Sequence, residues 1–176
     1  MSGVRERFVL PARLLHWTMA AMILGMLFVG VTMVSTVGAA HGALLAWHKP
    51  LGIAVLLLAL ARIAVRAIYR PPPLPADLPA WQRRAASLSH LLLYLLMVAM
   101  PLIGWAMLSA GGYPVQIFGR LRLPPIAPHD LRWYSRLHAA HAVLAGLFFA
   151  TVLLHLAAAL FHRLIRRDRV FHSMAP

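Results

Sequence analysis

The stretch that decides the fold is residues 137–161, LHAAHAVLAGLFFATVLLHLAAALF, which is apolar apart from one threonine and three histidines. At about 1.5 Å of rise per residue, it is long enough to cross a bilayer as one helix. His141 and His155 are fourteen positions apart. That spacing is close to four helical turns, so the two residues lie about 40° apart around the helix and about 21 Å apart along it. The helix therefore predicts two stacked sites that share one face.

His138 competes with His141 for the outer of these two sites. It stands seventeen positions before His155, which places it about 100° away from His155 around the helix. His141 is the better match, and it is our choice. We expect His138 to be a histidine of the outer rim, facing lipid headgroups or an anion that enters from outside.

Composition places the whole chain in a membrane. Of its 176 residues, 61% are hydrophobic and only 12% are charged, which is too apolar for an ordinary soluble domain. Besides 137–161, the stretches 14–34, 44–67 and 88–110 are long enough to span. The sequence predicts a single all-α domain over residues 1–176, built as a bundle of four transmembrane helices. The first span has no small-residue cleavage site after it, so we expect it to be retained.

Basic residues predict the orientation of the bundle. Eleven arginines flank the helices on one side: Arg5, Arg7, Arg13, Arg66, Arg70, Arg83, Arg84, Arg163, Arg166, Arg167 and Arg169. By the positive-inside rule both termini are expected in the cytoplasm. The basic residues that give the net charge of +13 flank the spans and do not form one recognition face. The expected partner is therefore lipid phosphate, and nucleic acid is not expected.

A smaller cationic set lies on the predicted outer side, accompanied by a single acid, Asp130. Its members are Lys49, Arg120, Arg122, Arg132 and Arg136. Two interpretations remain open for these residues. They anchor the protein at headgroups, or they form a positive funnel that steers an anion to a redox centre.

Four histidines lie near the ends of the spans and form two levels. His16 and His155 are expected near the cytoplasmic ends of their helices, and His48 and His141 near the outer ends. The chain contains no cysteine, which excludes thiolate-held iron–sulfur clusters and covalently attached c-type haem. A zinc site would need three or four clustered ligands, and the spans contain no acidic residue. Two neutral imidazoles at each level suit the axial ligands of a b-type haem.

Short motifs in order along the chain carry a family resemblance. They are Leu15-His16-Trp17, Trp47-His48 with Gly52, Ser89-His90-Leu-Leu-Leu-Tyr94, Pro101-Leu-Ile-Gly104, and Leu154-His155-Leu-Ala-Ala-Ala-Leu-Phe-His162 after His141. Over nearly its whole length, the chain resembles the bacterial four-helix cytochrome b561 family, which includes the di-haem superoxide oxidase. The resemblance implies two haems b, an inner one on His16 and His155 and an outer one on His48 and His141.

The resemblance also implies a function. It suggests an oxidoreductase of the bacterial inner membrane that oxidises superoxide, or another small reductant, at the outer face and reduces ubiquinone. In the family, the region of His162 is similar to a quinone pocket, and His90 is a second candidate for a quinone contact. The alternative is a cytochrome b subunit that passes electrons between quinol and a redox partner protein. A third class is a membrane protein without redox function, which would be colourless when purified.

Overall fold

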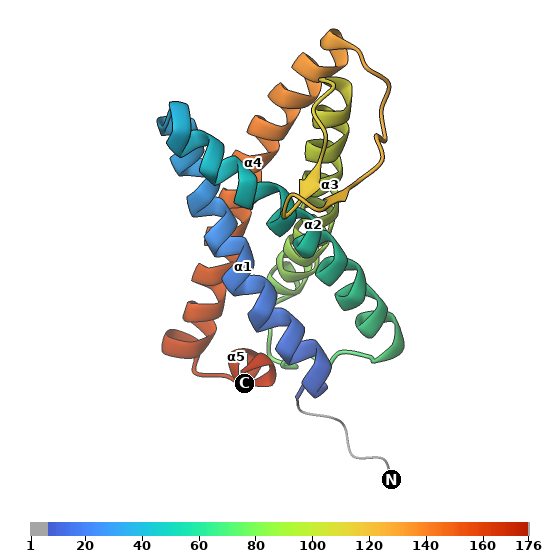
Figure 1. Cartoon of the computed structure of the whole chain (residues 1–176). Helices are drawn as coiled ribbons and strands as arrows, with labels where there is room; N and C mark the ends of the chain where they lie inside the picture. The colour runs from blue at the N-terminus through green and yellow to red at the C-terminus, as the bar shows by residue number, and fades with distance from the viewer. Residues whose placement is uncertain (1–6, 176) are drawn as a thin grey trace.

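The computed structural model describes residues 7–175, and helices make up most of it (Figure 1). The elements are α1 (Leu10–Ser35), α2 (Gly38–Ile68), α3 (Ala80–Ala110), β1 (Gln116–Ile117), β2 (Leu121–Arg122), α4 (Leu131–Leu160), the π-helix η1 (Phe161–Arg166) and α5 (Val170–Met174). Four helices are long and apolar enough to cross a membrane: α1, α2, α3, and α4 continued by η1. The predicted all-α architecture with four spans is confirmed.

The helices extend beyond the predicted apolar stretches. α2 begins at Gly38, α3 at Ala80 and α4 at Leu131, each about six to eight residues before the predicted start. The reason is that apolar composition marks the hydrocarbon thickness, whereas a helix continues through the headgroup layer for as long as its backbone groups find partners. At α4 this start is fixed by Asp130, whose carboxylate accepts hydrogen bonds from the backbone N–H groups of Arg132 and Trp133 at 2.7 and 3.1 Å.

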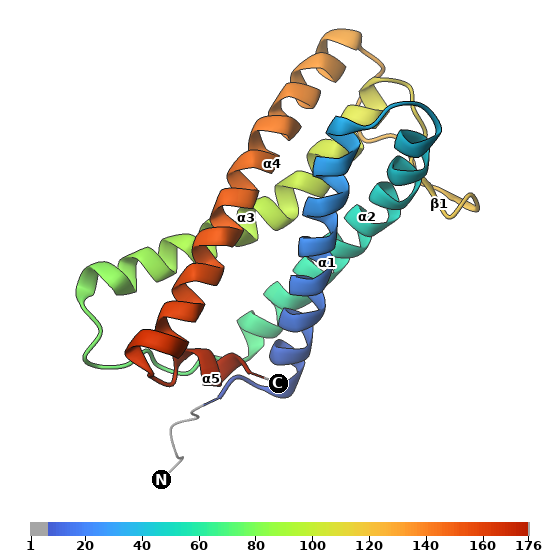
Figure 2. The same cartoon turned by 90° about the vertical axis from the view of Figure 1, so that its left-hand side faces the viewer.

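The helix contacts divide the bundle into two closely packed pairs. α1 runs along α2, and α3 runs along α4, while α2 joins the pairs through α3 (Figure 2). The backbone of α4 therefore has its long contact with α3, not with α1 or α2. The centre of the bundle is filled by an apolar core of Met19, Ile23, Val55, Ala59, Leu96, Met97 and Phe148.

Large apolar side chains cover the outside of the bundle. Phe28 and Leu154 are both 71% exposed, and many other leucines and valines of the four spans are exposed in the same way. A soluble monomer does not expose apolar surface on this scale. The exposed apolar surface fits helices whose outer faces contact lipid tails.

The start of α1 and the helix α5 lie at the same end of the bundle (Figure 1). Phe8 N–H donates to the Ser173 carbonyl at 3.0 Å, and the Arg13 Nε–H donates to the Ala175 carbonyl at 2.8 Å. Trp17 Nε1–H donates to the Met174 carbonyl at 2.9 Å. These bonds hold the C-terminal segment across the start of α1. We call this the α5 end, and the other the opposite end.

The connection between α3 and α4 carries the β1–β2 hairpin, in which Gln116 pairs with Arg122. Its turn contains Gly119 at φ +69°, a left-handed conformation that glycine adopts without strain. Trp105 Nε1–H donates to the Pro124 carbonyl at 3.0 Å, and Phe118 contacts Trp47 with ring centroids 5.9 Å apart. The loop is thus folded back against α3 and the first half of α2.

Candidate functional site

At the α5 end, three histidines from three helices meet. His16 of α1 and His155 of α4 have ring centroids 6.3 Å apart at an interplanar angle of 70°. His90 of α3 also faces His155, at 5.6 Å and 67°. All three side chains are half-buried. His90 was expected at the start of its helix, but it lies almost three turns inside α3, because α3 begins at Ala80.

At the opposite end, a second pair has almost the same geometry. His48 of α2 and His141 of α4 have ring centroids 6.3 Å apart at 69°. The Nδ1 atoms of both rings are buried and have no hydrogen-bond partner among the described residues. Buried polar atoms of a native protein normally have partners. Two buried nitrogen atoms without a partner in the described part of the chain are compatible with a group bound at this pair of rings.

The spacing of the two pairs fits one metal atom between each pair of rings. A metal–imidazole bond is about 2.0–2.1 Å long, and the ring centre lies roughly 1.1 Å behind its nitrogen, so rings on opposite sides of one metal have centroids about 6.3 Å apart. The 5.6 Å between His90 and His155 is too short for this arrangement. At the α5 end, the spacing therefore favours His16 and not His90 as the partner of His155.

The surroundings of the pairs also fit a flat cofactor. The two pairs connect α4 with α1 and with α2, and neither of these is the helix that packs closely against α4, which is α3. The histidine side chains therefore meet while the helix backbones stay apart. Across from His141, a Cβ atom built on Gly104 of α3 would lie 3.3 Å from the His141 Cε1 atom. Gly104 therefore lets the ring lie against the α3 backbone. Along α4, Phe148 of the apolar core lies midway between His141 and His155.

His138 belongs to neither pair. Its side chain is exposed, and its ring contacts Tyr134 at 6.1 Å. This placement agrees with the expected rim position and supports the choice of His141. No close contact like the one beside His141 exists at Gly25 or Gly146, since nothing lies within 4 Å of a Cβ built on either residue.

His162 lies in η1 and is bound by a carboxylate that sequence reasoning overlooked. The Nδ1 atom of His162 is 2.6 Å from Oδ2 of Asp168, and the two side chains are only 15% and 14% exposed. Arg166 Nε–H donates to the same oxygen at 3.0 Å and Arg166 Nη2–H donates to Asp77 at 2.6 Å. The other carboxylate oxygen of Asp168 accepts from the Val170 N–H at 3.0 Å. Burial of Asp168 raises its pKa, but the bonds from His162, Val170 and Arg166 outweigh it and lower the pKa below its usual value.

One signal in the sequence points to this partner, because Asp168 is the single acid that follows the fourth span. The contact between His162 and Asp168 depends on how the chain turns at the end of η1. Arg167 has φ +55°, and this left-handed residue turns the chain so that Asp168 N–H donates to the His162 carbonyl at 3.3 Å. A π-helical turn of this kind is common at functional sites.

The predicted steering cations lie on two separate elements of the opposite end. Lys49 is half-buried and lines a shallow groove with Trp47 of α2 and with Gln116, Phe118 and Gly119 of the hairpin. Arg120 and Arg122 are exposed on that hairpin, and Arg132 and Arg136 are exposed in the first turns of α4. Arg136 lies over the Trp133 ring, with its guanidinium carbon 5.6 Å from the ring centre.

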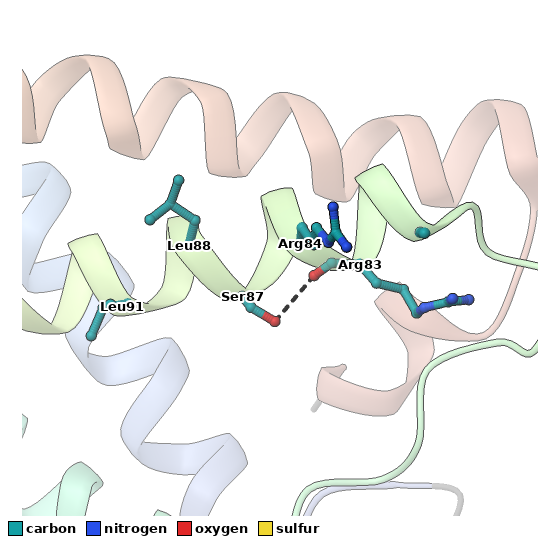
Figure 3. A pocket seen from close by; sticks show the side chains of 6 residues that line it. Arg83, Arg84, Ser87, Leu88 and Leu91 are labelled. Carbon is teal, nitrogen blue, oxygen red and sulfur yellow. Dashed lines mark hydrogen bonds between the residues drawn. The ribbon is translucent and has the colours of Figure 1, made fainter.

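A second shallow groove runs along the first turns of α3, near the α5 end (Figure 3). Its lining consists of Ala80, Arg83, Arg84, Ser87, Leu88 and Leu91. Basic residues followed by exposed leucines on one helix are typical of a membrane interface, where arginine contacts lipid phosphate. The groove therefore fits the expected lipid contact.

Comparison with known proteins identifies the family of this chain. A profile of the family described as prokaryotic cytochrome b561 matches residues 7–176. Cytochrome b561 homolog 2 of Escherichia coli is 31% identical over 96% of this chain and 91% of its own length, and cytochrome b561 homolog 1 of the same organism is 31% identical over 73% of each chain. A probable superoxide oxidase, CybB, of Yersinia pestis is 32% identical over 73% of each chain. This chain therefore belongs to the prokaryotic cytochrome b561 family, bacterial multi-pass membrane proteins that bind haem b and transfer electrons.

Proposed function

We propose that this protein is a di-haem oxidoreductase that oxidises superoxide at one membrane face and reduces ubiquinone at the other. The observation that carries the proposal is one geometry repeated at two depths, with both histidine pairs at 6.3 Å. His16 and His155 are the proposed axial ligands at the α5 end, and His48 and His141 those at the opposite end. Haem b held by these residues would supply a one-electron carrier at each depth.

The proposed orientation places the α5 end in the cytoplasm of a bacterium, with the helices in the inner membrane. It rests on the arginines of that end, which outnumber the basic residues of the opposite end and include Arg13, Arg66, Arg70, Arg83, Arg84, Arg163, Arg166 and Arg167. Short loops with excess arginine remain on the cytoplasmic side. The opposite end with its hairpin then faces outward.

The proposed substrate is a small anion, which suits the cationic residues of the opposite end. The Yersinia relative is named as a probable superoxide oxidase, and Lys49, Arg120, Arg122, Arg132 and Arg136 would raise the local concentration of superoxide. In the overall reaction, two superoxide ions each lose one electron and leave as dioxygen. One ubiquinone takes up these two electrons and two protons and becomes ubiquinol.

His162 is the proposed proton donor to ubiquinone at the α5 end. Its bond to Asp168 fixes the ring, and it leaves Nε2 as the atom that exchanges a proton with the quinone oxygen. A carboxylate beside the ring also stabilises the protonated imidazole between transfers. His90, which lies against His155, is the second candidate for a quinone contact.

The decisive test mixes purified protein with a superoxide source and ubiquinone and follows haem reduction and ubiquinol formation at several ionic strengths. We expect fast reduction in the absence of any other protein, and a rate that falls as salt increases, because exposed charges are screened beyond roughly 8 Å at physiological ionic strength. A haem reduction rate no better than that of a mono-haem control would exclude the oxidase. It would leave the alternative, a cytochrome b subunit between quinol and a redox partner protein.

The cationic residues have a prediction of their own. Replacing Arg120, Arg122, Arg132 and Arg136 together by Gln should slow reduction by superoxide about tenfold or more at low salt, because steering by charge is lost, and should leave the haem spectrum unchanged. The matched control replaces four exposed arginines near the α5 end, Arg66, Arg70, Arg83 and Arg84, by Gln. Equal slowing in both variants would show that net charge alone matters and would refute steering at the opposite end.

Gly104 provides a test of the second haem site. Gly104→Val should strongly reduce haem occupancy at the opposite end. A Cβ atom at position 104 would lie 3.3 Å from the His141 Cε1 atom, and the two methyl groups of valine would add further atoms close to the ring. The haem at the α5 end should be retained, as measured by haem content per chain and by redox titration. Gly146→Val is the control, since nothing lies within 4 Å of that Cβ. Full occupancy in Gly104→Val would contradict the assignment.

A further inference from the structure

Arg62 lies inside the second predicted span, near its inner end, and has no part in the proposed reaction. It lies in the last two turns of α2, and its side chain is half-buried. Its Nη1–H donates to His16 Nδ1 at 2.8 Å, and its Nε–H donates to the Tyr94 hydroxyl at 3.2 Å. The guanidinium carbon also lies 5.9 Å from the centre of the Tyr94 ring.

Among residues 7–175, no acidic side chain pairs with Arg62. The chain has four acidic residues. Asp130 caps α4, while Asp77 and Asp168 bind Arg166. The partners of Arg62 are a neutral ring and a neutral hydroxyl. Because a charged group within a span is costly, such residues pair with an opposite charge and mark functional sites.

The bond between Arg62 and His16 is incompatible with axial ligation of His16 through Nε2. Arginine has only donors, so His16 Nδ1 must accept, and the proton of the neutral ring then sits on Nε2. A ligating histidine instead binds the metal through one nitrogen and carries its proton on the other, where it donates to an acceptor. When His16 ligates, Arg62 must therefore release Nδ1, and its guanidinium is left beside the cofactor.

We propose that Arg62 binds a propionate carboxylate of the haem at the α5 end. Guanidinium and carboxylate form paired, charge-assisted hydrogen bonds, and a propionate would give Arg62 the opposite charge that no described acidic residue provides. The contact with Tyr94 keeps the guanidinium at this depth. The inference rests on the proposed haem site of His16 and His155, and it adds a residue that sets the affinity and potential of that haem.

Arg66 offers a matched control one turn further along α2. Its guanidinium carbon lies 5.8 Å from the same Tyr94 ring, but its side chain is exposed, and no hydrogen bond to a histidine of the site is found among the described residues. Arg66→Gln removes the same charge from the same helix at a position suited to lipid phosphate. It separates binding of the haem carboxylate from contact with lipid.

The experiment measures redox potentials and haem loss for the purified, haem-loaded protein in one detergent. Arg62→Gln should shift one of the two haems to lower potential, because loss of a nearby positive charge disfavours the added electron. The same haem should leave about tenfold faster or more toward an excess of haem-binding acceptor protein. In the His155→Ala background, Arg62→Gln should not move the potential of the remaining haem. Arg66→Gln should behave like the wild type.

A change in the cofactor tests the same contact without relying on one variant. Wild-type protein loaded with haem whose two carboxylates are methyl esters should lose this ester haem as fast as Arg62→Gln loses ordinary haem. When both proteins carry the ester haem, Arg62→Gln should lose it no faster than the wild type. An unchanged potential and loss rate in Arg62→Gln, or equal effects in Arg66→Gln, would overturn the proposal and indicate lipid contact. If Arg62→Gln does not fold, equal retention of ester and free-acid haem by wild type overturns it. Absence of haem at the α5 end in wild type would instead refute the proposed function.

Discussion

His155→Ala is expected to lower the haem content from about two to about one per chain, because the variant lacks one of the two proposed haem ligands at the α5 end. The remaining haem should keep its low-spin spectrum, since His48 and His141 lie at the other depth. His16→Ala should give the same result from another helix. Haem content per chain and a redox titration with one wave in place of two would measure both.

His90→Ala is the control that makes this prediction specific. His90 also faces the His155 ring, but at 5.6 Å, which is too close for ligands on opposite sides of one metal. We therefore expect His90→Ala to retain both haems. Loss of a haem in His90→Ala with retention in His16→Ala would assign the ligand to α3 in place of α1. Loss of both haems from a folded His155→Ala variant would contradict two separate sites.

His162→Ala is expected to slow the reoxidation of the haems by ubiquinone by about a hundredfold, the size of a general acid contribution. Both haems and their reduction by superoxide should remain, because His162 belongs to neither pair. The measurement is the rate of haem reoxidation after rapid mixing of reduced protein with ubiquinone. His172→Ala is the control, since His172 is exposed and is bound to Arg163 at 2.8 Å. Unchanged reoxidation would move the quinone site, with His90 as the next candidate.

Asp168→Asn refines the role of His162. Asparagine retains an oxygen that can accept the Val170 N–H and cap α5, but it cannot balance the charge of a protonated His162 ring. Reoxidation by quinone should therefore slow in this variant while the haem content stays the same. Asp77→Asn, which changes only the other partner of Arg166, should have little effect. Equal slowing by both variants would indicate a structural role for the whole cluster.

The fold was predictable because hydropathy and length are local properties. The stretch 137–161 and its three counterparts were predicted to span, and the structure has four such helices. Their ends were not predictable, since α2, α3 and α4 begin six to eight residues earlier. Capping by Asp130 and the polar turns in the headgroup layer set these ends, and hydropathy does not report on either.

The sequence by itself determined the two levels of histidines, because the repeat of the α-helix fixes where His141 and His155 lie on α4. It left His138 as a competitor of His141 and His90 as a candidate quinone contact, and it gave no role to Arg62 or Asp168. The arrangement of these side chains depends on the packing of α1, α2 and α3 around α4 and on the turn after η1. The packing separates the rings of His16 and His155, and of His48 and His141, by 6.3 Å, and it places Arg62 against His16. Spacing along one helix gives depth and face, whereas distances between helices depend on contacts between residues far apart in the chain.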